Sequence, residues 1–276
     1  MTARRLSLAA GTLRRSRRPD GVRAAAAVGF DAVGVRFDVD PPSPDDLDDL
    51  RRVLADTGLS VLDLEVVRIV PGDDADATRR LVDQGAEVGA EFLLVVSDDP
   101  DRARTIDRFA ETAAVAAEAG MGTALEFMRF TAVPTLADAL EVVAAAGAPA
   151  SGVVVDPLHL ARSGGSPGDV ASTDPRLLPY AQLCDAPGDA PGDPTDASLL
   201  ADEARHGRLL PGSGDLPLGE LVAALPPVPL SVEILSDVFD ALPAADVARR
   251  AIGATRRLLD GEVAARGPAS TVRATR

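Results

Sequence analysis

Four polar side chains stand where apolar segments of strand-like composition end, and each of them offers an oxygen atom. They are Glu126 after residues 123–125, Asp156 after 153–155, Gln182 within 180–183 and Glu233 after 230–232. Hard oxygen ligands suit Mg²⁺ or Mn²⁺. If the four segments are neighbouring strands of one sheet, their ends share a rim, and the sequence predicts a divalent-metal site at that rim.

The two glutamates of this set could also transfer protons. Carboxylates that reach one substrate carbon from different strands can remove a proton and return it. A metal that chelates a carbonyl and a neighbouring hydroxyl would acidify the carbon-bound proton and stabilise the enediolate. We therefore expect Glu126 and Glu233 to be the catalytic pair, with either of them as the base.

The elements that must position these residues follow from short apolar runs that alternate with Ala-rich helical segments. The predicted strands are residues 6–11, 33–37, 60–66, 91–97, 123–127, 152–156, 180–184 and 230–235. Glycines at 29, 58, 89, 120 and 147 fit the left-handed turn that ends a helix. Eight βα units of about 30 residues predict an α/β fold, a single-domain (β/α)₈ TIM barrel over residues 1–265. The alternative, a doubly wound sheet, would want a glycine-rich phosphate turn after its first strand, and residues 10–13 do not supply one.

Three segments depart from this regular pattern. Residues 186–198 are rich in Pro, Gly and Asp and predict a loop after the seventh strand, either a flap on the rim or a disordered acidic insert. Residues 266–276 are predicted to be a disordered tail. Arginines cluster between residues 4 and 18, but the apolar run 6–11 is too short for the core of an export signal. A first strand with solvated arginines around it is the preferred interpretation.

The composition of the 276-residue chain excludes several classes of chemistry. Its net charge of −15 opposes nucleic-acid binding, and no apolar run approaches a membrane span. The absence of lysine excludes Schiff-base, PLP and Walker-type chemistry. Two histidines cannot build a His-rich metal cluster, and one cysteine, Cys184, cannot form an intrachain disulfide. A reducing cytoplasm is the expected location, and a homo-oligomer is compatible with the sequence.

An ordered set of short motifs carries a family resemblance. The motifs are Leu125-Glu126-Phe127, Val-Val-Val-Asp156-Pro-Leu-His159, Gln182-Leu-Cys-Asp185, Arg208-Leu-Leu-Pro-Gly-Ser-Gly214-Asp and Ser231-Val-Glu233. Together they resemble the sugar phosphate isomerase/epimerase family of xylose isomerase-like TIM barrels, over nearly the whole chain. That family includes ketose 3-epimerases, hydroxypyruvate isomerase, keto-inositol dehydratase and bacterial dehydroshikimate dehydratases.

The resemblance implies a role for each motif residue. Glu126, Asp156, Gln182 and Glu233 would hold a divalent metal, Mn²⁺ or Mg²⁺ with Co²⁺ also compatible, and the two glutamates would be the acid/base pair. His159 and Arg208 would bind the substrate. Many members carry His-x-His on the seventh strand, where this chain has Tyr180-Ala181-Gln182, and a neutral amide binds softer metals more weakly than imidazole does. Asp185 is expected to orient Gln182 or His159 from behind.

Three functions are consistent with these residues, and each takes a small carbohydrate-like molecule. The first, which the sequence favours, is a divalent-metal-dependent isomerase or epimerase of a small sugar, keto-sugar or related polyol. The second is a dehydratase, a lyase acting on a keto-cyclitol, keto-sugar or dehydroshikimate-like substrate through the same enediolate. Product mass separates these two, because only the dehydratase releases water. The third is a non-catalytic sugar-binding barrel, which would be indifferent to chelator and added metal.

Overall fold

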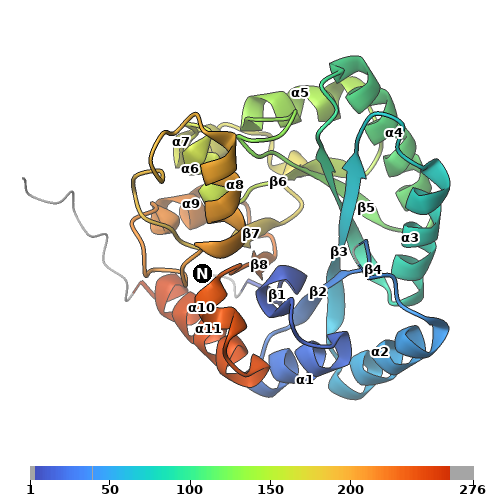
Figure 1. The fold of residues 1–276 in the computed structure, drawn as a ribbon, viewed down its shortest axis with the longest axis vertical. Coiled ribbons are helices and arrows are strands. Elements are labelled where there is room, and N and C mark those ends of the chain that lie inside the picture. Colours follow the sequence, from blue (N-terminus) through green and yellow to red (C-terminus); the bar gives the residue numbers. More distant parts are fainter. Residues whose placement is uncertain (1–3, 39, 262–276) are drawn as a thin grey trace, which may run out of the picture.

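The strands of the molecule form one parallel sheet that closes into a barrel (Figure 1). The computed structural model describes residues 4–38 and 40–261. The strand order is β6-β5-β4-β3-β2-β1-β8-β7, and a parallel bridge between Val155 and Ala181 joins the two ends of the sheet. The strands are β1 (Leu6–Leu8), β2 (Ala32–Arg36), β3 (Ser60–Ile69), β4 (Ala90–Ser97), β5 (Gly122–Glu126), β6 (Ser151–Val154), β7 (Ala181–Leu183) and β8 (Leu230–Val232).

Helices cross over between successive strands and form the outer layer (Figure 1). The α-helices are α1 (Arg18–Val28), α2 (Pro44–Thr57), α3 (Ala75–Glu87), α4 (Arg102–Glu118), α5 (Leu136–Ala146), α6 (Pro157–Arg162), α7 (Pro167–Ala171), α8 (Ala197–His206), α9 (Leu218–Ala224), α10 (Asp237–Asp240) and α11 (Ala244–Leu259). Short 3₁₀ turns, η1 (Ala10–Leu13) and η2 (Pro175–Leu177), complete the set. In the described part of the chain, no helix combines the length and the apolarity that a bilayer crossing requires.

The apolar core has two parts, as a closed barrel requires. The larger part packs the outer faces of the strands against the helices, and Leu50, Phe109 and Leu125 are among its fully buried members. The smaller part fills the interior of the barrel with side chains such as Leu62, Leu94 and Val154. Because side chains alternate along a strand, each interior residue is followed two positions later by another. This alternation carries the interior row of β5 and β6 to Glu126 and Asp156 at the open end.

The predicted elements are confirmed with small shifts at their ends. All eight predicted strands form, although the first is shorter than expected and gives way to η1. The five glycines predicted to end helices all adopt left-handed conformations, with φ between 61° and 87°. Residues 186–196 contain no helix or strand, and α8 begins at Ala197. The predicted tail, 266–276, lies outside the described residues.

Candidate active site

The four strand-end residues all lie at the carboxyl end of the barrel. Glu126 is the last residue of β5, Asp156 follows β6, Gln182 lies within β7 and Glu233 follows β8. All four residues are at most 6% exposed. Glu126 and Glu233 line the same cavity of about 90 Å³, together with His159, Arg208 and Glu65. The two carboxylates therefore face one common space from different sides of the barrel.

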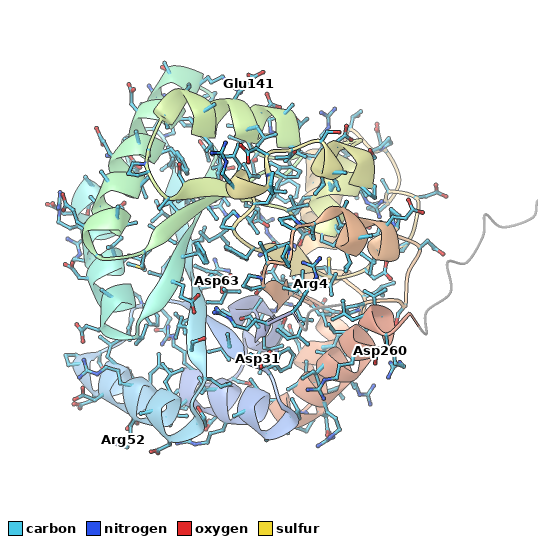
Figure 2. All side chains as sticks on the ribbon, turned by 180° about the vertical axis from the view of Figure 1, so that it is seen from behind. Arg4, Asp31, Arg52, Asp63, Glu141 and Asp260 are labelled. Carbon is cyan, nitrogen blue, oxygen red and sulfur yellow. The ribbon has the colours of Figure 1, made fainter. Side chains whose placement is uncertain are left out.

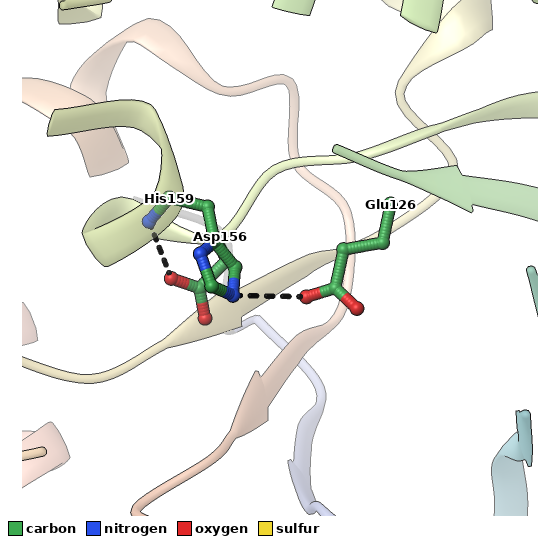
Figure 3. A group of neighbouring side chains, drawn as sticks. All are labelled: Glu126, Asp156 and His159. Atoms are coloured by element: carbon green, nitrogen blue, oxygen red, sulfur yellow. Dashed lines mark hydrogen bonds and ion pairs between the residues drawn. The ribbon is translucent and has the colours of Figure 1, made fainter. Parts of the chain in front are cut away.

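Glu126, Asp156 and His159 form a close cluster (Figure 3). The Nε2 atom of His159 is 3.8 Å from Oε1 of Glu126. Asp156 caps α6, because its Oδ1 atom accepts hydrogen bonds from the backbone amides of Leu158 at 2.7 Å and His159 at 3.1 Å. One ligand atom from each of the three residues lies within 4.8 Å of the other two. His159, predicted to contact substrate, thus also lies where it could bind a metal.

Arg208 is the counter-ion of this cluster. Its Nη1 atom donates to Oδ2 of Asp156 and lies 3.2 Å from Oε2 of Glu233. Its Nη2 atom is 3.3 Å from Nε2 of His159, and its Nε atom donates to the carbonyl of Ala204 at 2.8 Å. The guanidinium is almost completely buried. Arg208 therefore joins the ends of β6 and β8, in addition to facing the cavity.

Burial and charge divide the acidic residues into two kinds. Burial, followed by the charge of Glu233, raises the pKa of Glu126 well above its ordinary value. Burial also raises the pKa of Glu233, although Arg208 opposes the shift. Asp156 differs, because Arg208, His159 and backbone amides outweigh its burial and lower its pKa. The surroundings therefore favour the anion of Asp156, whereas burial favours the protonated forms of the two glutamates.

His159 is neutral at physiological pH. Burial lowers the pKa of its imidazole to about 4, and the nearby Arg208 adds to the shift against the opposing effect of Asp156. A neutral imidazole can accept a hydrogen bond or bind a metal through its free nitrogen. Its ring meets Phe130 edge-on at 5.7 Å between centroids, which fixes the orientation of the imidazole at the cavity.

Gln182 lies beside Asp156 in the sheet, since its backbone amide donates to the carbonyl of Val155 at 3.0 Å. Its side chain is 1% exposed, and within the described chain neither amide atom has a hydrogen-bond partner. A buried, unpartnered amide is costly, because polar groups in protein interiors are normally satisfied. A metal bound by the Gln182 oxygen would remove part of that cost. The donor set of carboxylates, amide oxygen and neutral imidazole fits a divalent ion.

Asp185 contacts neither Gln182 nor His159 through a side-chain hydrogen bond in the described structure. Its carboxylate accepts backbone hydrogen bonds from Gly212 at 3.0 Å, Gly214 at 2.8 Å and Leu216 at 3.1 Å, and one from Ala186. Asp185 and Leu209 also pair through their backbones. Asp185 therefore fixes the turn that follows Arg208 and does not orient Gln182 or His159 by a hydrogen bond.

Replacing Asp185 with alanine is expected to lower the free energy of unfolding by about 3 kcal/mol or more. The change leaves several backbone amides without their charged acceptor, and hydrogen bonds to charged groups contribute about 1.5–3 kcal/mol each. Urea unfolding measures the loss, and hydrogen exchange should accelerate at Gly212, Gly214 and Leu216. Asp189→Ala, at an exposed position of the loop that follows Asp185, is the control and should change the free energy of unfolding by no more than about 0.5 kcal/mol. Equal stabilities of the two variants would contradict the assigned role.

Two features of the site were not predicted from the sequence. Asp63 of β3 is fully buried inside the barrel, although the sequence signal was present as two acids, Asp63 and Glu65, in one apolar strand. Arg205 lies over the ring of Phe130, 5.8 Å from its centroid, and lines the cavity with Arg36 and Arg68. No local pattern distinguishes Arg205 from the many surface arginines of the chain.

Comparisons with known proteins agree with this architecture. Residues 22–258 match the family model described as a xylose isomerase-like TIM barrel. Two curated 3-dehydroshikimate dehydratases, from Pseudomonas aeruginosa and Pseudomonas putida, are 27% and 26% identical over 251 and 246 residues. Each alignment covers 82% of this chain and 37% of the relative. The chain therefore spans little more than a third of the length of these relatives.

Solved structures show the same fold at lower identity. The IOLI protein, solved with a bound zinc atom, superposes with a TM-score of 0.79 at 18% identity, covering 93% of this chain and 98% of that one. D-allulose 3-epimerase from Methylomonas sp., solved in complex with D-allulose, gives a TM-score of 0.72 at 16% identity, covering 92% and 98%. At these identities the likeness establishes the fold alone.

Proposed function

The chain belongs to the xylose isomerase-like TIM barrel family, and from this premise we propose that it is a divalent-metal-dependent enzyme that removes a proton next to a carbonyl group. The observation that carries the proposal is the pair Glu126 and Glu233. They line one cavity at the open end of the barrel, and burial raises the pKa of both. Carboxylates with raised pKa values that flank one space are suited to take up and deliver protons.

The residues that would hold the metal are Glu126, Asp156, Gln182 and Glu233, with His159 close enough to Glu126 and Asp156 to join them. Mn²⁺ or Mg²⁺ suits the oxygen ligands, and Co²⁺ is compatible with an added imidazole. Such an ion would supply a positive charge that stabilises the negative charge developing on the substrate carbonyl oxygen.

The protein groups divide the remaining work. One glutamate removes the proton next to the carbonyl, and the second delivers a proton on the other side of the cavity. Arg208 and His159, which lie between the two carboxylates, hold substrate oxygens by hydrogen bonds. If the second glutamate protonates a neighbouring carbon or the opposite face, the product is an isomer. If it protonates a departing hydroxyl group, the product is one water lighter.

The dehydratase is the better supported of these two outcomes. Both curated relatives are dehydratases of 3-dehydroshikimate. The open, carboxyl end of the barrel, which we call the mouth, also carries Arg36, Arg68 and Arg205 beside the acidic cluster. In the described chain no carboxylate lies within 4.0 Å of the Arg205 guanidinium. A neutral sugar needs no such cation, whereas a substrate that bears a carboxylate does. We therefore propose a lyase that acts on a carboxylated, dehydroshikimate-like cyclic ketone.

The epimerase remains the second candidate because the sugar-binding neighbour has the same barrel. Incubation of Mn²⁺-loaded protein with 3-dehydroshikimate, and separately with D-allulose, tests both by mass spectrometry. We expect a product one water lighter from the first substrate and no isobaric product from the second. An isobaric ketohexose would overturn the lyase in favour of the epimerase. If the protein converts neither substrate, and removing metal with a chelator does not change this result, the outcome would support a non-catalytic barrel.

A further inference from the structure

One side of the barrel interior, just beneath the mouth, is polar. Ser7 of β1, Asp63 of β3, Tyr180 before β7 and Ser231 of β8 are all fully buried. Other interior positions at similar depth are apolar, namely Ala32, Leu94, Ala124 and Val154. Asp63 is labelled in Figure 2, which views the barrel from the side opposite to Figure 1. We call the four polar residues the interior chamber.

The strand registers place two members of the chamber, Ser7 and Ser231, side by side. Ser7 pairs with Ser231, and Ser231 pairs with Gln182, so that three polar residues form a row across β1, β8 and β7. Asp63 reaches the interior through a bulge: Val33 pairs with Val61 but Gly34 pairs with Asp63, which leaves Leu62 as an extra residue. A bulge of this kind turns the following side chain to the other face of the sheet.

Glycine at position 34 provides the space for the carboxylate. A Cβ atom at Gly34 would lie 2.5 Å from Oδ1 of Asp63 and 2.9 Å from the backbone nitrogen of Ala10. No side chain larger than hydrogen fits there unless the acid moves. The bulge in β3 and the glycine in β2 thus act together to place one carboxylate inside the barrel.

The polar atoms of the chamber lack partners among the described residues. Neither carboxylate oxygen of Asp63 is hydrogen-bonded, and the hydroxyls of Ser7, Tyr180 and Ser231 are unpaired as well. Burial, and then the charge of Glu233, raises the pKa of Asp63 to about 7. The Tyr180 hydroxyl opposes the shift because it lies close to the carboxylate, although the two groups do not meet in normal hydrogen-bond geometry. No arginine is among the groups that chiefly set this pKa, in contrast to Asp156 and Glu233. A carboxylate buried without a counter-charge is strongly unfavourable.

We propose that the interior chamber binds one monovalent metal cation, with the Asp63 carboxylate as its charged ligand and the hydroxyls of Ser7, Tyr180 and Ser231 as neutral ligands. The donor set carries a single negative charge and otherwise offers neutral oxygens, which matches Na⁺ or K⁺. Divalent ions in proteins usually gather several carboxylates, and those lie one layer higher, at the mouth. The cation neutralises Asp63 and satisfies the hydroxyls of β1, of β8 and of the residue that precedes β7.

Thermal unfolding in the presence of EDTA tests the proposal, because EDTA removes any stabilisation by a divalent ion bound at the mouth. The salts are NaCl, KCl and choline chloride at equal ionic strength and about pH 8.5, above the pKa of Asp63. An ion that binds only the folded state raises Tm in a saturable way, by about 3–6 °C at roughly 100 mM. We expect this rise for Na⁺ or K⁺ relative to choline in the wild-type protein. Asp63→Asn should abolish it, whereas Asp83→Asn, at an exposed position of α3, should retain it.

Further measurements keep the result unambiguous. Ser231→Ala removes one neutral ligand and should shift the half-saturating ion concentration several-fold upward, even if Asp63→Asn does not fold. Crystals soaked in RbCl should show an anomalous peak beside Asp63. Equal Tm values in choline, Na⁺ and K⁺, or an Asp63→Asn protein that responds like the wild type, would overturn the proposal and leave a chamber that holds only water. None of these readouts depends on the proposed enzymatic activity.

Discussion

Glutamine at position 126 or 233 is expected to lower kcat for the dehydroshikimate-like substrate by about 10³-fold, because general acid–base groups contribute about 10²–10⁴-fold. The glutamine amide has about the size of the carboxyl group but cannot transfer a proton as the carboxyl group does. Stability should not fall, since burial raises the pKa of both glutamates and thus disfavours their charged forms. Steady-state kinetics on the Mn²⁺-loaded proteins, together with urea unfolding, measure the two effects separately.

Deuterium exchange from solvent then assigns the two roles. In D₂O the variant that lacks the base should stop exchanging the proton next to the carbonyl. The variant that lacks the acid should still exchange this proton while it forms little product. Glu118→Gln, an exposed change at the end of α4, is the matched control and should leave both rates unchanged. A folded Glu126→Gln or Glu233→Gln protein with wild-type kcat would remove that residue from the proposed mechanism.

The barrel was predictable because its signals are local. Buried parallel strands are continuous apolar runs, and glycine ends helices for steric reasons that involve only neighbouring residues. The rim position of Glu126, Asp156 and Glu233 followed from the same logic, because residues that follow parallel strands must lie at one end of the sheet. The register between β6 and β7 was not predictable from the sequence. In the described structure these two strands are joined only by the bridge between Val155 and Ala181 that closes the barrel.

The partners of the site residues depend on contacts between distant segments. Arg208 and Asp156 are 52 residues apart in the chain, and no local pattern indicates that they form an ion pair. The turn whose amides Asp185 binds lies 27 to 31 residues further along the chain, and no local pattern indicates this contact. The inward position of Asp63 depends on a bulge in β3, and no local sequence pattern indicates that bulge.

Replacing Arg208 with methionine is expected to lower the free energy of unfolding of the metal-free protein by about 3–5 kcal/mol at pH 7. Methionine fills much of the volume but leaves the Asp156 carboxylate buried beside Glu233 without its counter-ion. Urea unfolding measures the loss. Arg249→Met, which removes an exposed pair with Asp246, is the control and should cost no more than about 0.5 kcal/mol.

The pH dependence and a double-mutant cycle show whether the Arg208 effect is electrostatic. Arg208 holds the pKa of Asp156 below 3.8, so the stabilisation is complete above about pH 4 and disappears as the pH falls through the lowered pKa. The difference between wild type and Arg208→Met should therefore shrink in acid. Combining Arg208→Met with Asp156→Asn should cost less than the two single losses added together, by more than about 1 kcal/mol. Additive losses that do not change with pH would mean that Arg208 stabilises the barrel by packing, and that the carboxylates at the mouth do not depend on its charge.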